Sequence, residues 1–223
     1  MKRFAIITAG GTGLRMKSQI PKQFLCVGDL PILMHTINRF YQFDNRINII
    51  LSLPENYLKY WENLCKKYNF RIPVTIVKGG KTRFHSIKNA LDVIDKAGFV
   101  AVHDGVRPLV NAATIKRTFD EAEKLGNAVA SCDIVFSIRK IEGQKNIGVN
   151  RTFYKEIQTP QTFNIQALKY AYNSDCKDEF TDDASVFEAA GHQIHLVKGN
   201  KENIKITSSE DLIIAEALLN RIV

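Results

Sequence analysis

Cysteine is scarce in this sequence, with four among 223 residues and no C-x-x-C pair. The four are dispersed, so neither a zinc site nor a disulfide framework is indicated, and free thiols of a cytosolic protein are expected. The five histidines show no metal-ligand spacing, and no G-x-S-x-G motif occurs. The sequence therefore does not support a histidine-bound zinc site or a serine hydrolase.

Long apolar runs and tracts of one charge are also missing. No run of about 18 apolar residues occurs, which excludes a transmembrane helix, and the apolar run 4–7 is too short for a signal peptide. We therefore expect a cytoplasmic protein that does not contact a membrane. The formal charge is +8, but no basic tract of five or more residues occurs. A solvated basic surface or an anionic small substrate is favoured over nucleic acid, which we do not expect as a partner.

Apolar β-rich runs alternate with segments of helical period, which predicts an α/β fold with a mostly parallel sheet flanked by helices. Six strands are expected, at 4–8, 47–53, 74–77, 99–103, 128–131 and 193–197. Pro31 is expected as the first residue of one helix, and Thr207 with Glu210 as the capping box of the last helix. No repeat or long linker interrupts the chain, so residues 1–223 are predicted to form one domain.

Residues 136–157 break this alternation. They are polar and strand-like, with a turn signal at Gly143-Gln144-Lys145-Asn146. The segment predicts a β-hairpin arm that protrudes from the domain.

The segment I-I-T-A-G-G-T-G-L-R-M (6–16), followed by P-K-Q (21–23), carries the strongest functional signal. Glycines let the backbone aim its N–H groups at anionic oxygens, and Arg15 and Lys22 add positive charge. The spacing fits neither a P-loop, because Arg15 stands at its second glycine position, nor a dinucleotide fingerprint, because Met16 stands at its third. We therefore expect a polyphosphate-binding loop of another type.

Further polar clusters follow predicted strands, where open α/β sheets bind ligands. Asp104 in H-D-G-V-R-P is a candidate Mg²⁺ ligand, and Arg107 a candidate phosphate clamp. Thr181 is expected to cap a helix, with a second role facing a ligand. Lys205, taken alone, is expected on the surface. Other clusters are G-G-K-T-R-F-H-S (79–86) and Q-T-P-Q (158–161).

Taken in order, A-G-G-T-G-L-R-M, P-K-Q, G-G-x-x-R-x-x-S, H-D-G-V-R-P, T-P-Q, T-D-D-A-S and N-I-K-I-T-x-x-E-D-L resemble the 2-C-methyl-D-erythritol 4-phosphate cytidylyltransferases of the non-mevalonate isoprenoid pathway. The resemblance covers almost the whole chain. It implies a Rossmann-like nucleotidyltransferase fold and a homodimer in which the arm, residues 136–157, reaches into the neighbouring subunit. It also implies Mg²⁺ as cofactor, with CTP and a sugar-alcohol phosphate as substrates.

The resemblance implies a role for each matching residue. Arg15 and Lys22 would be catalytic, and Asp104 would bind the metal. The expected nucleotide-binding residues are Ala9, Gly10, Gly11, Gly80, Lys81, Ser86, Asp104 and Gly105. The expected acceptor-binding residues are Arg107, Thr181 and Lys205, together with Ser137 and Arg151 from the partner subunit.

Two positions depart from the family pattern, and the second of them bears on the acceptor. Relatives often carry an acidic residue where this chain has Lys81, and Asp-Thr where it has Phe136-Ser137. Ribitol-5-phosphate cytidylyltransferases resemble the same motifs, so another polyol phosphate stays open as acceptor. A non-catalytic nucleotide sensor is the alternative of another class, although the presence of Arg15, Lys22 and Asp104 together argues against it.

Overall fold

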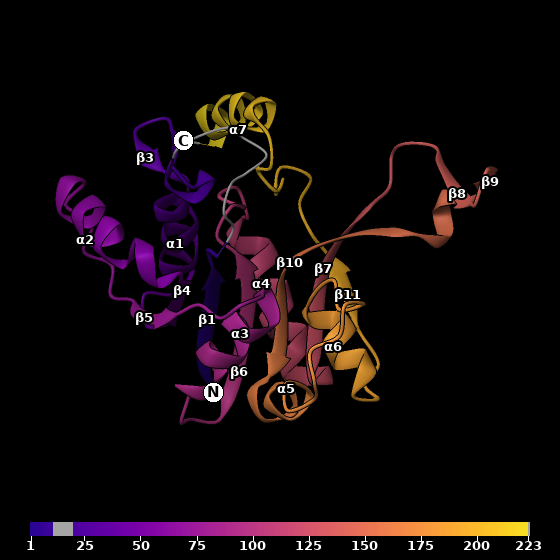
Figure 1. Cartoon of the computed structure of the whole chain (residues 1–223), viewed down its shortest axis with the longest axis horizontal. Helices are drawn as coiled ribbons and strands as arrows, with labels where there is room; N and C mark the ends of the chain where they lie inside the picture. The colour runs from indigo at the N-terminus through magenta and orange to yellow at the C-terminus, as the bar shows by residue number, and fades with distance from the viewer. Residues whose placement is uncertain (11–19, 223) are drawn as a thin grey trace.

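The computed structural model describes residues 1–10 and 20–222, without the side chain of residue 222. A seven-stranded sheet forms its centre, in the order β11-β7-β10-β6-β1-β4-β5 (Figure 1). All neighbours pair in parallel except β10, which is antiparallel to both β6 and β7. The strands are β1 (Lys2–Thr8), β4 (Asn48–Leu53), β5 (Thr75–Lys78), β6 (Gly98–Asp104), β7 (Asn127–Asp133), β10 (Lys155–Asn164) and β11 (Leu196–Lys198).

Two apolar layers cover the sheet because its central strands alternate buried side chains between both faces. In β1, Ala5 and Ile7 join the core formed with α1 (Ile32–Phe43), α2 (Leu58–Lys67) and α4 (Ala112–Leu125). Phe4 and Ile6 join the opposite core, formed with α3 (Arg83–Asp92), α5 (Ile165–Ala171) and α6 (Asp183–Ala189). The predicted mostly parallel α/β sheet is therefore confirmed.

The last helix, α7 (Ser209–Ile222), belongs to a third, smaller apolar cluster. Its Ala215 packs there with Val106 and Ile206. Val106 lies just beyond the end of β6, so α7 covers part of the carboxyl edge of the sheet. No helix among the described residues is long and apolar enough to cross a bilayer.

Strand β10 was not predicted. Its sequence, K-E-I-Q-T-P-Q-T-F-N, has little apolar alternation and contains a proline. It forms a strand because it pairs on both sides, and a bulge between Ile157 and Gln161 accommodates the middle of the segment. The strand expected at 193–197 is also shifted, since β11 pairs with β7 through Leu196–Lys198.

Three predicted helix starts are wrong by one residue. Pro31 precedes the first helical residue and occupies the N-cap position of α1. At the N-terminus of α7 the reciprocal bonds join Ser208 and Asp211, not Thr207 and Glu210: the Asp211 N–H donates to Ser208 Oγ, and the Ser208 N–H donates to an Asp211 carboxylate oxygen. The N–H and hydroxyl of Thr207 also donate to that carboxylate. At α6, the cap is Asp182 rather than Thr181. In each case adjacent residues can all cap or begin a helix, and packing decides between them.

The predicted arm is present as a separate two-stranded sheet. Strands β8 (Ile138–Glu142) and β9 (Lys145–Val149) pair antiparallel, and Gly143 in the turn has a φ of 61°. Positive φ costs glycine little, which suits it to this tight turn. Figure 1 shows the hairpin standing away from the body on two extended segments.

Candidate active site

A cavity of about 240 Å³ opens at the carboxyl edge of the sheet, and we call it the small cavity. It lies where β6 ends, α3 begins and β10 passes antiparallel. This is the edge at which open α/β sheets bind ligands. Its lining residues are mostly charged or polar: Arg83, Asp104, Arg107, Ile157, Gln158, Thr159, Gln161, Thr181, Asp182 and Lys205.

Asp104 lies at the centre of the charges in the small cavity. Its Oδ2 lies 3.0 Å from Lys205 Nζ and 3.3 Å from Arg107 Nε, and its Oδ1 lies 3.8 Å from Arg83 Nε. Burial alone would raise the pKa of this carboxyl, but Arg83, Lys205 and Arg107 outweigh burial and hold that pKa well below its usual range. Asp104 is therefore ionised at every physiological pH.

Arg83 has a second, fully buried counter-charge. Its guanidinium makes two hydrogen bonds to the Asp183 carboxylate, one of them 3.0 Å long, and Asp183 also accepts the Tyr172 hydroxyl at 2.6 Å. Burial lowers the pKa of Arg83, but Asp183 and Asp104 more than compensate and raise it. Asp182 also lines the small cavity, so the three cations Arg83, Arg107 and Lys205 are balanced by three carboxylates, those of Asp104, Asp182 and Asp183. The cavity therefore offers fixed cationic groups to an anion without a net positive charge of its own.

His103 holds the turn that carries Asp104 and Arg107. Its Nε2 lies 3.1 Å from the Arg107 carbonyl, so Nε2 carries the hydrogen and Nδ1 accepts from the Thr159 hydroxyl at 2.9 Å. The same hydroxyl accepts the Asp104 N–H at 3.1 Å. Burial lowers the pKa of His103 to about 4, so the imidazole is neutral at pH 7. His103 is thus a buried structural residue rather than a metal ligand.

Asn203 connects Arg107 to β10. Its backbone carbonyl accepts Arg107 Nη1 at 2.8 Å, and its side-chain amide donates to the Thr159 carbonyl at 2.7 Å. Asn203 is fully buried. The guanidinium of Arg107 is therefore fixed from two directions, by Asp104 and by this carbonyl.

The glycine-rich residues gather beside the small cavity. The Gly80 N–H donates to Ser86 Oγ at 3.0 Å, and a Cβ on Gly10 would lie 3.9 Å from that same oxygen. The local backbone fold requires glycine at position 80, because a Cβ there would lie 2.3 Å from the Cβ of His85. A Cβ on Gly105 would likewise lie 3.0 Å from the Thr8 carbonyl. The fold itself therefore disfavours a side chain at positions 80 and 105, but not at position 10.

The remaining predicted residues fall into three groups. Gly11 and Arg15 lie outside the described residues. Lys22 is half-buried and begins the short 3-10 helix η2 (Lys22–Phe24), and Lys81 is exposed before α3. Ser137 and Arg151 lie at the base of the arm and do not line the small cavity of their own chain; Arg151 donates to the Val135 carbonyl.

Sequence reasoning missed the supporting network. Arg83, Asp183, His103 and Thr159 were all within the motifs named above, but none was assigned a role. Arg83 follows two glycines at a predicted helix start, and Asp183 belongs to an acidic pair, so both carried a charge signal. Only their proximity in space, 100 residues apart in sequence, shows that they pair.

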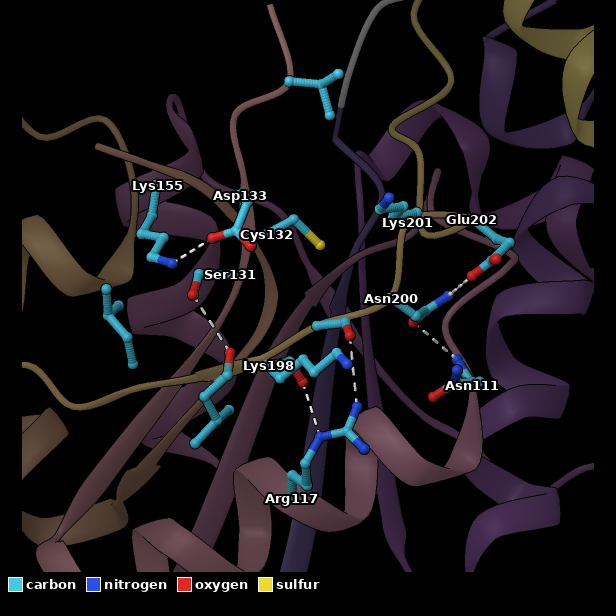
Figure 2. A pocket seen from close by; sticks show the side chains of 14 residues that line it. Asn111, Arg117, Ser131, Cys132, Asp133, Lys155, Lys198, Asn200, Lys201 and Glu202 are labelled. Atoms are coloured by element: carbon cyan, nitrogen blue, oxygen red, sulfur yellow. Dashed lines mark hydrogen bonds and ion pairs between the residues drawn. The ribbon is translucent and has the colours of Figure 1, made fainter. Parts of the chain in front are cut away.

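A second cavity, of about 740 Å³, lies beside β7 and β11, and we call it the large cavity. Figure 2 shows that its polar side chains bond mainly to one another or to nearby backbone. Lys155 pairs with Asp133, Asn200 bonds to the Asn111 N–H and Glu202, and Arg117 Nε donates to the Lys198 carbonyl at 2.8 Å. No charge in it is as deeply buried as Asp104 or Asp183. The chemistry therefore favours the small cavity as the active site.

The family profile described as "IspD: 2-C-methyl-D-erythritol 4-phosphate cytidylyltransferase" matches residues 4–221. Proteins of that name from Bacteroides thetaiotaomicron and Phocaeicola vulgatus are 47% and 48% identical over 219 residues, which is 98% of this chain and 100% of each relative. The crystal structure of 4-diphosphocytidyl-2C-methyl-D-erythritol synthase from Anaerococcus prevotii is 28% identical, with a TM-score of 0.84 over 99% of this chain and 96% of that chain. A match of this length, together with a charged cavity at the expected sheet edge, means that the chain belongs to the 2-C-methyl-D-erythritol 4-phosphate cytidylyltransferase family.

Proposed function

We propose that this enzyme transfers the cytidylyl group of CTP to 2-C-methyl-D-erythritol 4-phosphate, a step of isoprenoid biosynthesis, and that the reaction takes place at the small cavity. The chain is a nucleotidyltransferase of the family named above. One observation carries the location: Arg83, Arg107 and Lys205 converge on the buried carboxylate of Asp104. Three fixed cations around one partly buried site suit two phosphate-bearing substrates.

The nucleotide would bind along the glycine-rich side of this edge. Ala9, Gly10, Gly11, Gly80 and Gly105, with Lys81, Ser86 and Asp104, would surround CTP. Arg15 and Lys22 would neutralise its triphosphate. The clustering of Gly10, Gly80 and Ser86 supports this arrangement.

The acceptor phosphate would bind to Arg107, Thr181 and Lys205, all of which line the small cavity. Ser137 and Arg151 would complete this pocket from the arm of a partner subunit. Their position on an arm that stands away from the body is consistent with that role.

Asp104 fits Mg²⁺ as one ligand of a shared site. Mg²⁺ commonly takes only one or two protein carboxylates and completes its shell with water and substrate phosphates. The described residues contain no group of three potential metal-ligating side chains, so the substrates would have to supply the other ligands. When bound, the ion would neutralise phosphate charge.

In the reaction, an oxygen of the acceptor phosphate attacks the α-phosphorus of CTP. The new P–O bond forms as the bond between the α-phosphorus and the bridging oxygen breaks, and pyrophosphate leaves with the electron pair. The attacking phosphate is already an anion, so no general base is needed. Arg15 and Lys22 would stabilise the charge that grows on the α-phosphoryl and pyrophosphate oxygens.

The arm supports a homodimer. Phe136 and Phe153 are 82% and 83% exposed, and Val135, Ile141 and Ile147 are also exposed. An isolated two-stranded hairpin is barely stable in water, and exposed apolar side chains of this kind mark a protein contact. We therefore propose that a second copy covers the arm, and that the enzyme works in the cytoplasm, where its four free cysteines stay reduced.

A pyrophosphate-release assay tests this function. Purified enzyme would be supplied with CTP and either 2-C-methyl-D-erythritol 4-phosphate or ribitol 5-phosphate, with and without Mg²⁺. Release with the first acceptor only, and only with the metal, is expected. Faster release with ribitol 5-phosphate would replace the acceptor, and CTP binding without release with either would indicate a sensor.

Two variants test the residue roles. Lys22→Ala should lower kcat by roughly 10²–10³, by analogy with loss of one preorganised donor. Arg107→Ala should weaken binding of the acceptor but not of CTP. Normal turnover by the first variant, or weakened CTP binding alone in the second, would show that the assigned role is wrong.

A further inference from the structure

Gln23 is a buried amide that directly follows Lys22. It is the middle residue of η2, and only 1% of its surface is exposed. Its Nε2 donates to the Ala9 carbonyl at 2.7 Å. A carbonyl oxygen can only accept, so the amide nitrogen must face it, which settles the orientation of this side chain.

Ala9 is held on both of its backbone groups. Its N–H donates to the Ser52 carbonyl at 3.0 Å near the end of β4, and its carbonyl accepts from Gln23. Ala9 is therefore fixed to the sheet, and Gln23, 14 residues further along the chain, is fixed to Ala9. The short helix that begins with Lys22 is thus tied to the carboxyl edge of the sheet.

The opposite side of η2 is anchored in the core. Phe24 is 3% exposed, and its ring lies 5.7 Å from that of Tyr57 and 5.1 Å from that of Tyr60. The Lys22 carbonyl accepts the Leu25 N–H at 3.1 Å. Phe24 fixes η2 against the helical layer, and Gln23 supplies the remaining contact, toward the active site.

Stability alone does not account for an amide at this position. Gln23 Oε1 is buried and has no hydrogen-bond partner among residues 1–10 and 20–222. A buried acceptor without a partner costs free energy, and methionine at this position would exchange the unpaired Gln23 Oε1 for an unpaired Ala9 carbonyl in nearly the same space. The amide has one identified bond, and that bond connects the residue after Lys22 to Ala9, the residue that follows β1.

We propose that Gln23 is a positioning residue that acts through Lys22, by holding η2 against Ala9 so that the lysine ammonium reaches the triphosphate. The inference rests on the proposed function, in which Lys22 stabilises the charge that develops on CTP. Small displacements of a charged group at a reacting centre are costly, since a shift of about 1 Å can lower a rate about 100-fold. Gln23 itself need not touch either substrate.

A double-mutant cycle tests the proposal. Gln23→Met, Lys22→Ala and the double variant would be compared in the pyrophosphate-release assay, with melting temperatures recorded for each. Gln23→Met should lower kcat about 10- to 100-fold, while KM for the acceptor changes less than about twofold. If Gln23 acts through Lys22, the double variant should be no slower than Lys22→Ala by more than about twofold.

Asn127→Leu is the matched control. Asn127 is also a buried amide that donates to a backbone carbonyl, that of Gln193 at 2.8 Å, but it lies at the start of β7, at the opposite edge of the sheet. Because Asn127 Oδ1 also accepts the His195 N–H, Asn127→Leu removes two buried hydrogen bonds. It should lower the melting temperature at least as much as Gln23→Met and leave kcat unchanged. If Gln23→Met does not fold, Gln23→Leu replaces it, since leucine also lacks the N–H donor and introduces no buried charge.

The possible outcomes distinguish an error in the proposed role of Lys22 from an error in the proposed role of Gln23. If Lys22→Ala keeps normal turnover, the proposed function of Lys22 is wrong. If Lys22→Ala is slow but the two losses multiply in the double variant, or Asn127→Leu lowers kcat as much as Gln23→Met, then Gln23 has only a structural role and the positioning inference is wrong.

Discussion

The large cavity and the small cavity differ in how their charges are arranged, and the smaller of the two holds the buried charges. The large cavity has three times the volume of the small one, about 740 against 240 Å³. Its acidic groups are satisfied locally: Asp133 by Lys155, and Glu202 by the Asn200 amide. In the small cavity, charges from α3, from the turn after β6 and from the segment after β11 converge on one buried carboxylate.

This difference shows where a fold tolerates an unfavourable arrangement. Removing a charge from water costs several kcal/mol, and apolar side chains in its place are often more stable. A surface ion pair, such as Lys155 with Asp133, costs and contributes little. Buried charges that converge from separate segments are therefore the better indication of function, because stability does not require them.

The largest expected effect is on stability at the small cavity. Asp183→Asn leaves Arg83 without its buried counter-charge, so the free energy of unfolding should fall by about 3–5 kcal/mol. Urea denaturation would measure it. The control is Asp133→Asn in the large cavity, where the pair with Lys155 is exposed and no measurable change is expected. Equal losses in the two variants would remove the distinction between the cavities.

The next effect is on catalysis. Lys205→Ala removes a cation 3.0 Å from Asp104, and kcat/KM for the acceptor should fall about 100-fold, as for loss of one preorganised charge. Lys198→Ala removes an exposed cation that lines the large cavity, and should change kcat/KM by less than about twofold. A larger effect for Lys198 than for Lys205 would mean that the acceptor binds in the large cavity and not in the small cavity.

A pH effect follows from His103. Its pKa is about 4 in the folded protein and roughly 6.5 in the unfolded chain, so the unfolded state binds more protons between these values. Stability is therefore lost as the pH falls through this window. Between pH 7 and pH 5, the wild type should lose about 2 kcal/mol more than His103→Gln. Parallel pH profiles for the two proteins would mean that His103 is not buried as a neutral residue.

The smallest effect is expected at the wall of the large cavity. Arg117→Ala removes hydrogen bonds to the Lys198 carbonyl and to the Thr114 hydroxyl, and should cost about 1 kcal/mol of unfolding free energy. Turnover should be unchanged, because no catalytic charge is lost. A clear fall in kcat would show that this wall is coupled to the active site.

Much of the small cavity was predictable from sequence. The motif after one strand predicts Asp104 and Arg107 as site residues, the family resemblance adds Thr181 and Lys205, and all four line it. Lys205 is exposed, as expected for this residue taken alone, and its ammonium nevertheless contacts a buried carboxylate. The neutral, structural role of His103 agrees with its lack of metal-ligand spacing.

The rest depended on strand β10. Because its sequence is polar, β10 is not recognisable as a central strand. It lies antiparallel between β6 and β7, and this position brings the Thr159 hydroxyl to the Asp104 N–H. No local pattern predicts that contact, because 55 residues separate the two. The helix caps at Asp182 and Ser208 were also missed by one residue, since neighbouring side chains had equal capping ability.

By itself, the sequence determined the alternation of strands and helices, the places where glycine is needed and the types of charge available at the sheet edge. These follow from short-range preferences of each residue and its neighbours. Tertiary structure alone decided which charges meet: that Arg83 pairs with Asp183, that three cations share Asp104, and that Gln23 holds Ala9. Electrostatic and hydrogen-bond energies depend on distance through space, and the fold, not the order of residues along the chain, sets that distance.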